Sequence, residues 1–172
     1  MMIFETSRLY ARPLLEHDDG AFYDLMSNPQ VMDPIPQKPF NRAESSSKLL
    51  ELMALEKSSD TKIWSLCIKG RKELIGICGL LKNDEQEDEI AYRIRETFWG
   101  NGYGTEIAKG LIDYCFDTMN SDLVTADVCI DNFKSVKILN KYFTLKKEFF
   151  NADDQCVDRR YVLTKAEWLD SN

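Results

Sequence analysis

Three glycines at alternate positions lie in residues 99–106 (WGNGYGTE) and lead directly into an amphipathic helical pattern. Glycine lets backbone amides approach a bulky anion closely, and the first turn of a helix offers unpaired N–H groups at the positive end of its dipole. We therefore interpret Gly100, Gly102 and Gly104 as the backbone of a site that binds the pyrophosphate of a cofactor.

The spacing of these glycines argues against two familiar phosphate-binding motifs. The dinucleotide fingerprint needs G-x-G-x-x-G at the opening of a βαβ unit, whereas the glycines here alternate and lie in the middle of the chain. No Gly-Lys-Ser/Thr follows them, as a P-loop would require. The cofactor is therefore expected to be neither a nicotinamide or flavin dinucleotide nor a P-loop nucleotide.

Length and residue content limit the class of protein. The 172 residues suit a single domain at positions 1–172, with no linker, repeat or low-complexity segment. No stretch has the pattern of a signal peptide or is apolar for long enough to span a membrane, so we expect a cytoplasmic protein. The five cysteines form no C-x-x-C pair, which favours buried, reduced thiols.

Charge and histidine content narrow the function further. The net charge of −7 argues against a basic face that binds nucleic acid; it is compatible with a cationic or amine-bearing substrate, or simply with solubility. The single histidine, His17, argues against a histidine metal site or a Ser-His-Asp triad. We expect no metal, no nucleic-acid partner and no membrane partner, and either a monomer or a homodimer.

Hydrophobic periodicity predicts the order of elements. Alternation predicts strands at residues 8–14, 63–68, 74–81, 89–94, 123–130, 148–150 and 159–163. Helical spacing predicts helices at residues 17–28, at 42–57, after the glycines and at 132–142. This order predicts an α+β fold, with a central mixed, mostly antiparallel sheet of about seven strands and helices on both faces.

Further segments carry a family resemblance. Residues 5–14 are ETSRLYARPL, residues 28–32 are NPQVM, residues 89–92 are EIAY, and residues 132–141 contain N-x-x-S-x-x-x-L-x-K. Together with WGNGYGTE, they resemble in sequence and in order the motifs of the GNAT superfamily of acetyl-CoA-dependent N-acetyltransferases. The branch they are most similar to includes the ribosomal-protein N-terminal acetyltransferases RimJ and RimL. The resemblance covers nearly the whole chain and implies the GNAT fold.

The resemblance implies that acetyl-CoA is the acetyl donor. The backbone from Asn101 to Thr105 would bind the pyrophosphate, and the end of the strand at residues 92–94 would pair with the pantetheine arm and donate to the thioester oxygen. Asn132 and Ser135 are implied pantetheine contacts. Asn132 also suits a cap for the helix that follows it, and the two roles can coexist. The expected cofactor-binding residues are Tyr92, Arg93, Ile94, Gly100, Asn101, Gly102, Tyr103, Gly104, Thr105, Asn132 and Ser135.

Transfer of an acetyl group to an amine needs a base, and two carboxylates are candidates. Glu89 lies on the strand where many superfamily members place an acid that works through water. Asp127 precedes Asn132 by five residues, where the related RimI enzyme carries a glutamate. Both also fit as solvent-facing carboxylates. If positioning does most of the work, loss of either acid costs less than the roughly 10²- to 10⁴-fold expected of a general base.

The proton donor to the departing thiolate is less clear. Many members place a tyrosine four residues before the glycine of a K-x-G-F sequence, but Leu139 occupies that position and residues 141–144 are KYFT. Tyr142 is the candidate near the end of the same helix, with a core role as the alternative. These departures motivate a second hypothesis, a non-catalytic acetyl-CoA sensor or interaction module.

The main prediction is an N-acetyltransferase that moves the acetyl group of acetyl-CoA to a primary amine by direct attack in a ternary complex. The acceptor is either a protein N-terminus or a small-molecule amine. No cysteine has a histidine partner that would make it an acyl-accepting nucleophile. A thioester hydrolase is a third possibility. We expect residues 35–40 and the helix at 42–57 to shape the acceptor pocket.

Overall fold

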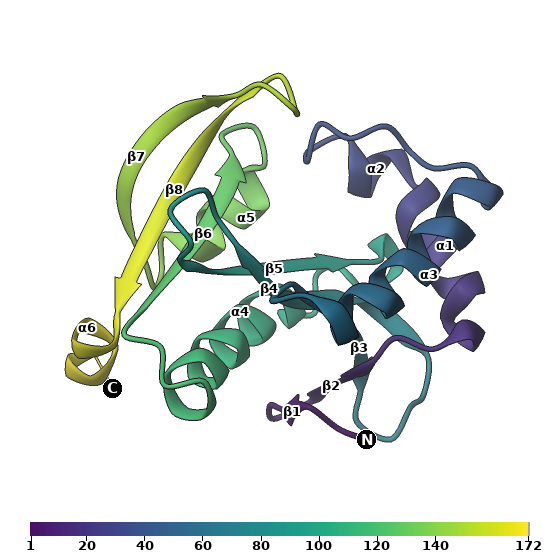
Figure 1. Cartoon of the computed structure of the whole chain (residues 1–172), viewed down its shortest axis with the longest axis horizontal. Helices are drawn as coiled ribbons and strands as arrows, with labels where there is room; N and C mark the ends of the chain where they lie inside the picture. The colour runs from purple at the N-terminus through teal and green to yellow at the C-terminus, as the bar shows by residue number, and fades with distance from the viewer. Residues whose placement is uncertain (172) are drawn as a thin grey trace.

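The computed structural model describes residues 1–171 and contains one sheet with the strand order β1-β2-β3-β4-β5-β6-β8-β7 (Figure 1). The strands are β1 (Phe4–Glu5), β2 (Leu9–Pro13), β3 (Lys62–Ile68), β4 (Leu74–Lys82), β5 (Asp88–Ile94), β6 (Leu123–Cys129), β7 (Thr144–Asn151) and β8 (Cys156–Thr164). Within residues 1–171, β5 and β6 form the single parallel pair. The predicted mixed, mostly antiparallel sheet is confirmed.

The helices follow the predicted order with two additions. They are α1 (Asp19–Ser27), α2 (Pro29–Met32), α3 (Arg42–Ser58), α4 (Tyr103–Asp113), α5 (Phe133–Leu139) and α6 (Lys165–Asp170), with the short turns η1 (Glu16–Asp18), η2 (Glu96–Phe98) and η3 (Tyr114–Thr118). The C-terminal α6 and the short α2 were not expected. Pro29 ends the predicted first helix and starts α2, where Asn28 caps the new helix by accepting from the Gln30 amide.

The sheet opens between β5 and β6, and this opening positions the site. The register pairs Asp88 with Val124 and Glu89 with Thr125, and no further pairs follow. Beyond Glu89, β5 stays with β4, while β6 continues with β8 and β7 as a second wing of the sheet (Figure 1). The two wings are therefore held together at one end and diverge at the other.

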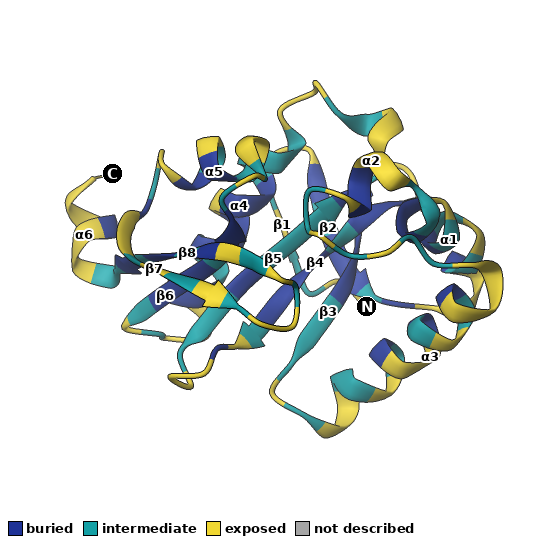
Figure 2. Cartoon of the chain, turned by 90° about the horizontal axis from the view of Figure 1, so that it is seen from above, coloured by how far each residue is buried: buried dark blue, intermediate teal, exposed yellow. Residues whose placement is uncertain are grey.

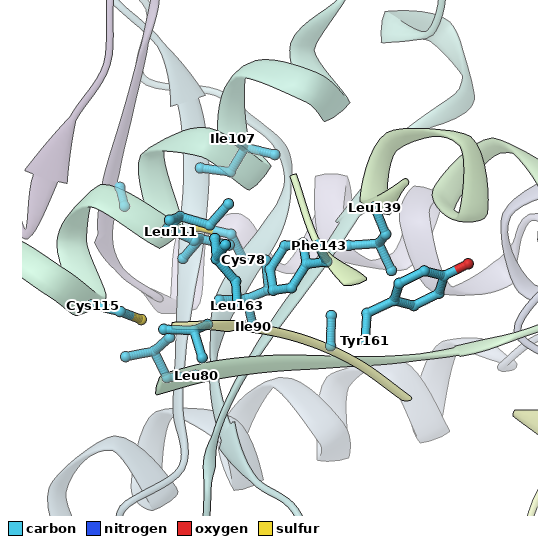
Figure 3. Packing of buried hydrophobic residues seen from close by; sticks show 14 of the residues in the cluster. Cys78, Leu80, Ile90, Ile107, Leu111, Cys115, Leu139, Phe143, Tyr161 and Leu163 are labelled. Atoms are coloured by element: carbon cyan, nitrogen blue, oxygen red, sulfur yellow. The ribbon is translucent and has the colours of Figure 1, made fainter. Parts of the chain in front are cut away.

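Two apolar clusters stabilise the opposite faces of the sheet. On one face, Ile107 and Leu111 of α4 pack with Cys78 of β4 and Phe143, as Figure 3 shows in part. On the other face, Phe22 of α1 and Leu49 of α3 belong to a second cluster. The central strands are mostly buried, whereas exposed residues line the outer side of α3 (Figure 2). Helices thus cover both faces, as predicted.

Local capping explains where α3 begins. The Asn41 side chain accepts from the Glu44 amide at 2.9 Å, and the Glu44 carboxylate accepts from the Asn41 amide at 2.7 Å. This capping box satisfies two backbone donors that would otherwise have no partner. Within residues 1–171, none of the helices combines the length and apolar character needed to cross a bilayer.

Candidate active site

The first cavity lies between the end of β5, the glycine turn and α5. Its volume is 520 Å³. It brings together the residues predicted to bind the cofactor, although they come from two distant parts of the chain. Ten of these residues line it: Tyr92, Arg93, Ile94, Gly100, Gly102, Tyr103, Gly104, Thr105, Asn132 and Ser135. Asn101 does not line it, because its side chain turns back to donate to the carbonyls of Phe98 and Trp99 at 3.0 and 3.1 Å.

The glycine turn presents free amides at the start of α4. Gly102 adopts a φ of +78°, a conformation that favours glycine, and its carbonyl accepts the first helical hydrogen bond, from Glu106 at 3.1 Å. The amides of Tyr103, Gly104 and Thr105 precede that bond and so have no helical acceptor. Together with the positive end of the α4 dipole, they form a site suited to a phosphate group.

A charged clamp holds this turn from the amino-terminal motif. Glu106 accepts from the Arg8 guanidinium at 2.6 Å and from the Thr6 hydroxyl at 2.6 Å, and Arg8 also donates to the Asn101 carbonyl at 3.0 Å. Desolvation would raise the pKa of Glu106, but the hydrogen bonds from Thr6 and Arg8 outweigh it and lower that pKa. The carboxylate is thus ionised, and Arg8 offsets its charge beside the phosphate site.

The gap in the sheet leaves backbone groups of β5 without a strand partner. The Arg95 amide donates to the Ile75 carbonyl of β4 at 2.9 Å, and the register pairs Arg93 with Ile77 of the same strand. Because hydrogen-bonding direction alternates along a strand, the backbone groups of Tyr92 and Ile94 face the gap. The Ile94 carbonyl accepts from the Trp99 indole at 2.8 Å. The amides of Tyr92 and Ile94 remain available to an extended ligand.

Helix α5 supplies the opposite wall of the first cavity. The Asn132 side chain caps α5 by accepting from the Ser135 amide at 3.4 Å, so the capping alternative is realised and the residue also lines the cavity. Close packing brings α5 here, since a Cβ on Gly104 would lie 2.9 Å from the Ile138 side chain. Lys134, which sequence reasoning missed, lies over the Trp99 ring with its amine 3.5 Å from the ring centroid.

A hydroxyl group is buried where the cavities meet. Within residues 1–171, the Tyr92 hydroxyl is buried without a hydrogen-bond partner, and it lies near Ser135. Desolvation raises the pKa of Tyr92 to about 12, more than Ser135 lowers it, so the phenol stays protonated at neutral pH. A buried donor without an acceptor is costly for the fold and is ready to donate to a ligand.

A second cavity of 390 Å³ continues from the first on the β6 side of the gap. Both cavities are lined by Ile35, Tyr92, Arg93, Asn132 and Ser135, so they adjoin one another at the opening of the sheet. We refer to the two adjoining cavities together as the passage. The second cavity is rich in carboxylates, which are Glu89, Asp127, Asp154 and Asp158. Such a lining suits an amine that enters from the side opposite to the glycine turn.

The two predicted base candidates differ in their surroundings. Desolvation, together with the negative charge of Asp127, raises the pKa of Glu89 to about 7, which is the range required of a base at neutral pH. Asp127 instead forms a bidentate ion pair with Arg160, at 2.8 and 2.7 Å, and Arg160 is only 2% exposed. Since both of its oxygens hold a buried guanidinium, Asp127 has the geometry of a structural partner of Arg160.

The structure does not bring Tyr142 to the passage. Helix α5 ends at Leu139, and the Tyr142 ring packs edge-on against Trp168 of α6 with 5.8 Å between ring centroids. Tyr142 lines neither cavity. The core alternative describes its placement, and the geometry gives no support to Tyr142 as proton donor.

The prediction that residues 35–40 and the helix at 42–57 shape the acceptor pocket agrees with the structure only in part. Ile35 and Gln37 line the second cavity, but Phe40 packs in the cluster below α1 and α3, and α3 contributes no residue to either cavity. Strands β6 and β8 and the turn after β7 take that place with Asp127, Asp154 and Asp158. Sequence spacing gave no indication that these strand ends would meet residues 35–37.

Two cysteines and an acid lie close together, and two of the three, Cys129 and Asp158, line the second cavity. Cys129, Cys156 and Asp158 place their ligand-type atoms within 4.8 Å of one another. The Cys156 thiol donates to Asp158 at 3.2 Å, and burial, followed by its hydrogen bond to Asp158, raises the pKa of that thiol. Cys156 is thus a protonated, hydrogen-bonded thiol, and all five cysteines of the chain are unbridged.

Comparison with known proteins agrees with this geometry. The chain is 28% identical over 160 residues to an uncharacterized N-acetyltransferase, p20, of Bacillus licheniformis, across 91% of this chain and 89% of p20. The fold is similar to that of a GNAT-family acetyltransferase from Bacillus anthracis, with a TM-score of 0.82 at 20% identity over 96% of this chain and 99% of the other.

It is also similar to RimL, a ribosomal L7/L12 alpha-N-protein acetyltransferase solved with coenzyme A, with a TM-score of 0.77 at 16% identity over 95% of this chain and 98% of RimL. The family model for the acetyltransferase (GNAT) domain matches residues 8–142. The chain therefore belongs to the GNAT family of acetyltransferases, enzymes that take their acetyl group from acetyl-CoA.

Proposed function

We propose that this chain is an N-acetyltransferase that transfers the acetyl group of acetyl-CoA to a primary amine by direct attack in a ternary complex. The observation that carries the proposal is that the two cavities adjoin and share part of their lining. One cavity has free helix amides suited to a pyrophosphate, and the other has the carboxylates that suit an amine. The two reactants would meet in the gap between β5 and β6.

The donor end fits acetyl-CoA on three counts. Amides of the glycine turn lack helical acceptors, amides of Tyr92 and Ile94 lack a strand partner, and the Tyr92 hydroxyl lacks any acceptor among residues 1–171. Acetyl-CoA supplies a thioester, which is the activated form of the acetyl group. The glycine turn, the β5 amides and α5 would hold its pyrophosphate and pantetheine arm, with Arg8 and Lys134 providing nearby positive charge.

Glu89 is the base in this proposal. An ammonium group must lose a proton before its nitrogen can attack a carbonyl carbon, and a carboxylate with a pKa near 7 accepts that proton at neutral pH. Asp127 contributes by raising the Glu89 pKa through its charge while it remains paired with Arg160. It acts on the reaction through its effect on Glu89.

Tyr92 takes the place expected for Tyr142. Its amide faces the gap and is suited to donating to the thioester oxygen. Its neutral, buried hydroxyl is suited to giving a proton to the sulfur as the carbon–sulfur bond breaks. We therefore assign both the oxygen contact and the proton donor to Tyr92.

The ETSRLYARPL motif supports placing the chain in the RimJ and RimL branch, since Thr6 and Arg8 of this motif hold Glu106. We further propose that residues 1–172 form a single catalytic domain. Within that branch, the acceptor is either a peptide N-terminus or a small-molecule amine. The acidic lining of the second cavity supports an acceptor that arrives as a cation.

The test is release of free CoA from acetyl-CoA with amine acceptors, alongside a control that contains no acceptor. The panel should include amino acids, short peptides, polyamines, amino sugars and aminoglycosides. Acceptor-dependent release at about 1 to 10³ per second supports the proposal. Release without an amine would indicate a thioester hydrolase, and acetyl-CoA binding without any release would favour the sensor alternative.

A further inference from the structure

Arg93 of β5 is a partly buried cation that has no carboxylate within ion-pairing distance in residues 1–171. Its Nη1 group lies 3.2 Å from the Met26 sulfur and 3.1 Å from the Met32 sulfur, and Nη2 donates to the Gln37 carbonyl oxygen at 3.4 Å. Thioethers are weak acceptors, and the amide contact is long. Five strong donors are therefore left almost without acceptors.

The other buried or half-buried arginines described below each pair with a carboxylate. Arg12 forms a bidentate pair with Asp18, Arg95 binds Asp24 and Glu73, and Arg160 binds Asp127. Each of these guanidinium groups has a carboxylate on it, as expected for a charge removed from water. Desolvation lowers the pKa of Arg93 to about 10, so it still carries its charge at neutral pH. Arg93 is thus the exception that lacks an anion.

The position of Arg93 points to a ligand. It lines both cavities, so its remaining exposed surface faces the passage. The phosphate site at the glycine turn does not require it, because that turn presents its own helix amides. Among the residues that line the acceptor cavity, Arg93 is the one cation, and it lies on β5 together with Glu89, whereas Asp127, Asp154 and Asp158 come from β6, β8 and the turn between β7 and β8.

We propose that Arg93 binds a carboxylate carried by the acceptor, so that the acceptor is a small zwitterion of the α-amino acid type. This inference rests on the proposed function and names its substrate class. An arginine fork matches a carboxylate in two parallel hydrogen bonds, which fixes the orientation of the molecule that carries it. The amine beside that carboxylate would then face the gap where Tyr92 and Ile94 present their amides.

The spacing along β5 agrees with this arrangement. Glu89 and Arg93 share one face of the strand and are four residues apart, about 13 Å at roughly 3.3 Å per residue. Because the two Cα atoms are this far apart, we expect Glu89 to take the proton of an α-amino group near Arg93 through water. The passage is large enough for that water, since the second cavity alone measures 390 Å³.

Asp154 is the rival partner within the chain. It lines the same cavity, lies next to Gln37, and acts on Arg93 through its charge without reaching ion-pairing distance. If Asp154 moved onto Arg93 in solution, the guanidinium would need no ligand. Removal of the Asp154 charge distinguishes the two arrangements. If Asp154 pairs with Arg93 in solution, its loss frees Arg93 to bind the carboxylate of an acceptor. If Asp154 does not pair with Arg93, its loss leaves acceptor binding unchanged.

The kinetic test uses acceptors in matched pairs: L-methionine with 3-(methylthio)propylamine, L-phenylalanine with 2-phenylethylamine, L-leucine with isopentylamine, and L-lysine with cadaverine. The wild-type protein should prefer the amino acid of at least one pair by roughly 100-fold or more in kcat/KM. Arg93→Met should remove that preference, with a much larger loss of kcat/KM for the amino acid than for the matched amine. Arg93→Lys keeps the positive charge but lacks the two parallel donors of arginine. Its preference for the amino acid should lie between those of wild type and Arg93→Met.

The controls are Arg71→Met and Asp154→Asn. Arg71 is exposed and lies in the turn before β4, so its variant should behave as wild type. Asp154→Asn should retain the preference for the amino acid. The inference is overturned if the amine is the better member of every pair, if the preference survives in Arg93→Met, or if a preference for the amino acid appears only in Asp154→Asn.

A binding test separates this inference from the proposed function. Protein saturated with CoA is titrated calorimetrically with N-acetyl-L-leucine and N-acetyl-L-phenylalanine, and with N-isopentylacetamide and N-phenethylacetamide, which lack the carboxylate. Binding that needs both the carboxylate and Arg93 supports the inference even if no acetyl transfer is found, in which case the proposed function alone fails. The inference is overturned if each N-acetyl amino acid binds as well as its counterpart without the carboxylate, or if none of the four compounds binds.

Discussion

The guanidinium of Arg8 lies 2.6 Å from the carboxylate of Glu106, and this ion pair joins the amino-terminal motif to the first turns of α4. The Glu106 side chain is only 15% exposed and is close to the amides proposed to bind the pyrophosphate. Without Arg8, its negative charge would oppose an anion at the helix start. The pair therefore links the fold of the first strand to the electrostatics of the donor site.

Replacement of Arg8 should weaken cofactor binding. We expect Arg8→Gln to raise the Kd for acetyl-CoA by roughly 3- to 10-fold, since one nearby cation is typically worth about 1 kcal/mol at a partly exposed site. The double variant Arg8→Gln/Glu106→Gln should recover much of the loss, because it removes the charge that Arg8 offsets. A calorimetric double-mutant cycle measures this. Strictly additive effects of the two substitutions would contradict the coupling.

Gly102→Glu should abolish detectable acetyl-CoA binding while the protein remains folded. The new side chain brings negative charge to the helix start, and its Cβ contacts only the Arg8 guanidinium, at 3.5 Å. Gly70→Glu is the matched control, because Gly70 has a similar φ of +81° and open space around it. Both variants carry the same backbone strain, of about 1–2 kcal/mol. If both bind acetyl-CoA equally well, the glycine turn is not the pyrophosphate site.

Glu89 should affect stability in a predictable pH window. Its pKa is raised from 4.5 to about 7 in the folded state, so the unfolded chain releases this proton at lower pH. Its contribution therefore destabilises the fold as pH rises from about 4.5 to 7, by about 3 kcal/mol in total. Urea denaturation at pH 5 and at pH 8 gives the change in the free energy of unfolding between these two pH values. The decrease from pH 5 to pH 8 should be smaller for Glu89→Gln than for wild type. Parallel changes in the two proteins would show that the pKa is not raised.

Tyr92→Phe should separate catalysis from binding. Loss of the hydroxyl is expected to lower kcat by roughly 10- to 100-fold with little change in KM for acetyl-CoA. Thermal stability should be unchanged or higher, because the variant removes a buried donor that has no acceptor in residues 1–171. Tyr142→Phe is the control and should retain full turnover. Equal turnover of wild type and Tyr92→Phe would remove Tyr92 from the mechanism.

Asp127→Asn should act mainly on the fold. It breaks the bidentate pair with a guanidinium that is 2% exposed, and loss of one partner of a buried pair costs about 3–5 kcal/mol. Asp84 and Glu85 remain on Arg160 and should reduce that cost. Acetyl-CoA affinity, measured below the melting temperature, should stay near wild type. A variant as stable as wild type but inactive would instead favour Asp127 as the base.

The order of elements could be predicted because periodicity is local. Apolar periodicity was enough to predict α3. The capping boxes that begin α3 (Asn41 with Glu44) and α6 (Thr164 with Glu167) are further local signals, which the prediction did not use. The two-residue strand β1 is too short to show alternation. It pairs with β2 across a short turn, with Phe4 opposite Ala11 and Glu5 opposite Tyr10.

The site was only partly predictable for the same reason. The glycine turn and the end of β5 have local signatures, whereas the opening between β5 and β6 depends on how far two strands stay paired. Tyr142 was misplaced because α5 ends at Leu139, which turns that ring toward Trp168. The unpaired charge of Arg93 and the ion pair of Asp127 are visible only when distant residues are brought together.

The central claim is that an amine takes the acetyl group inside the passage, with Glu89 as the base. The most direct measurement is mass spectrometry of acceptors incubated with acetyl-CoA labelled in the acetyl group, followed by kcat/KM against pH for wild type and Glu89→Gln. We expect the labelled acetyl group on the amine nitrogen. We also expect kcat/KM of the wild type to rise with pH through a pKa of about 7, and Glu89→Gln to lose both this rise and most of the rate. Label released only as acetate, or an unchanged profile in Glu89→Gln, would contradict the account.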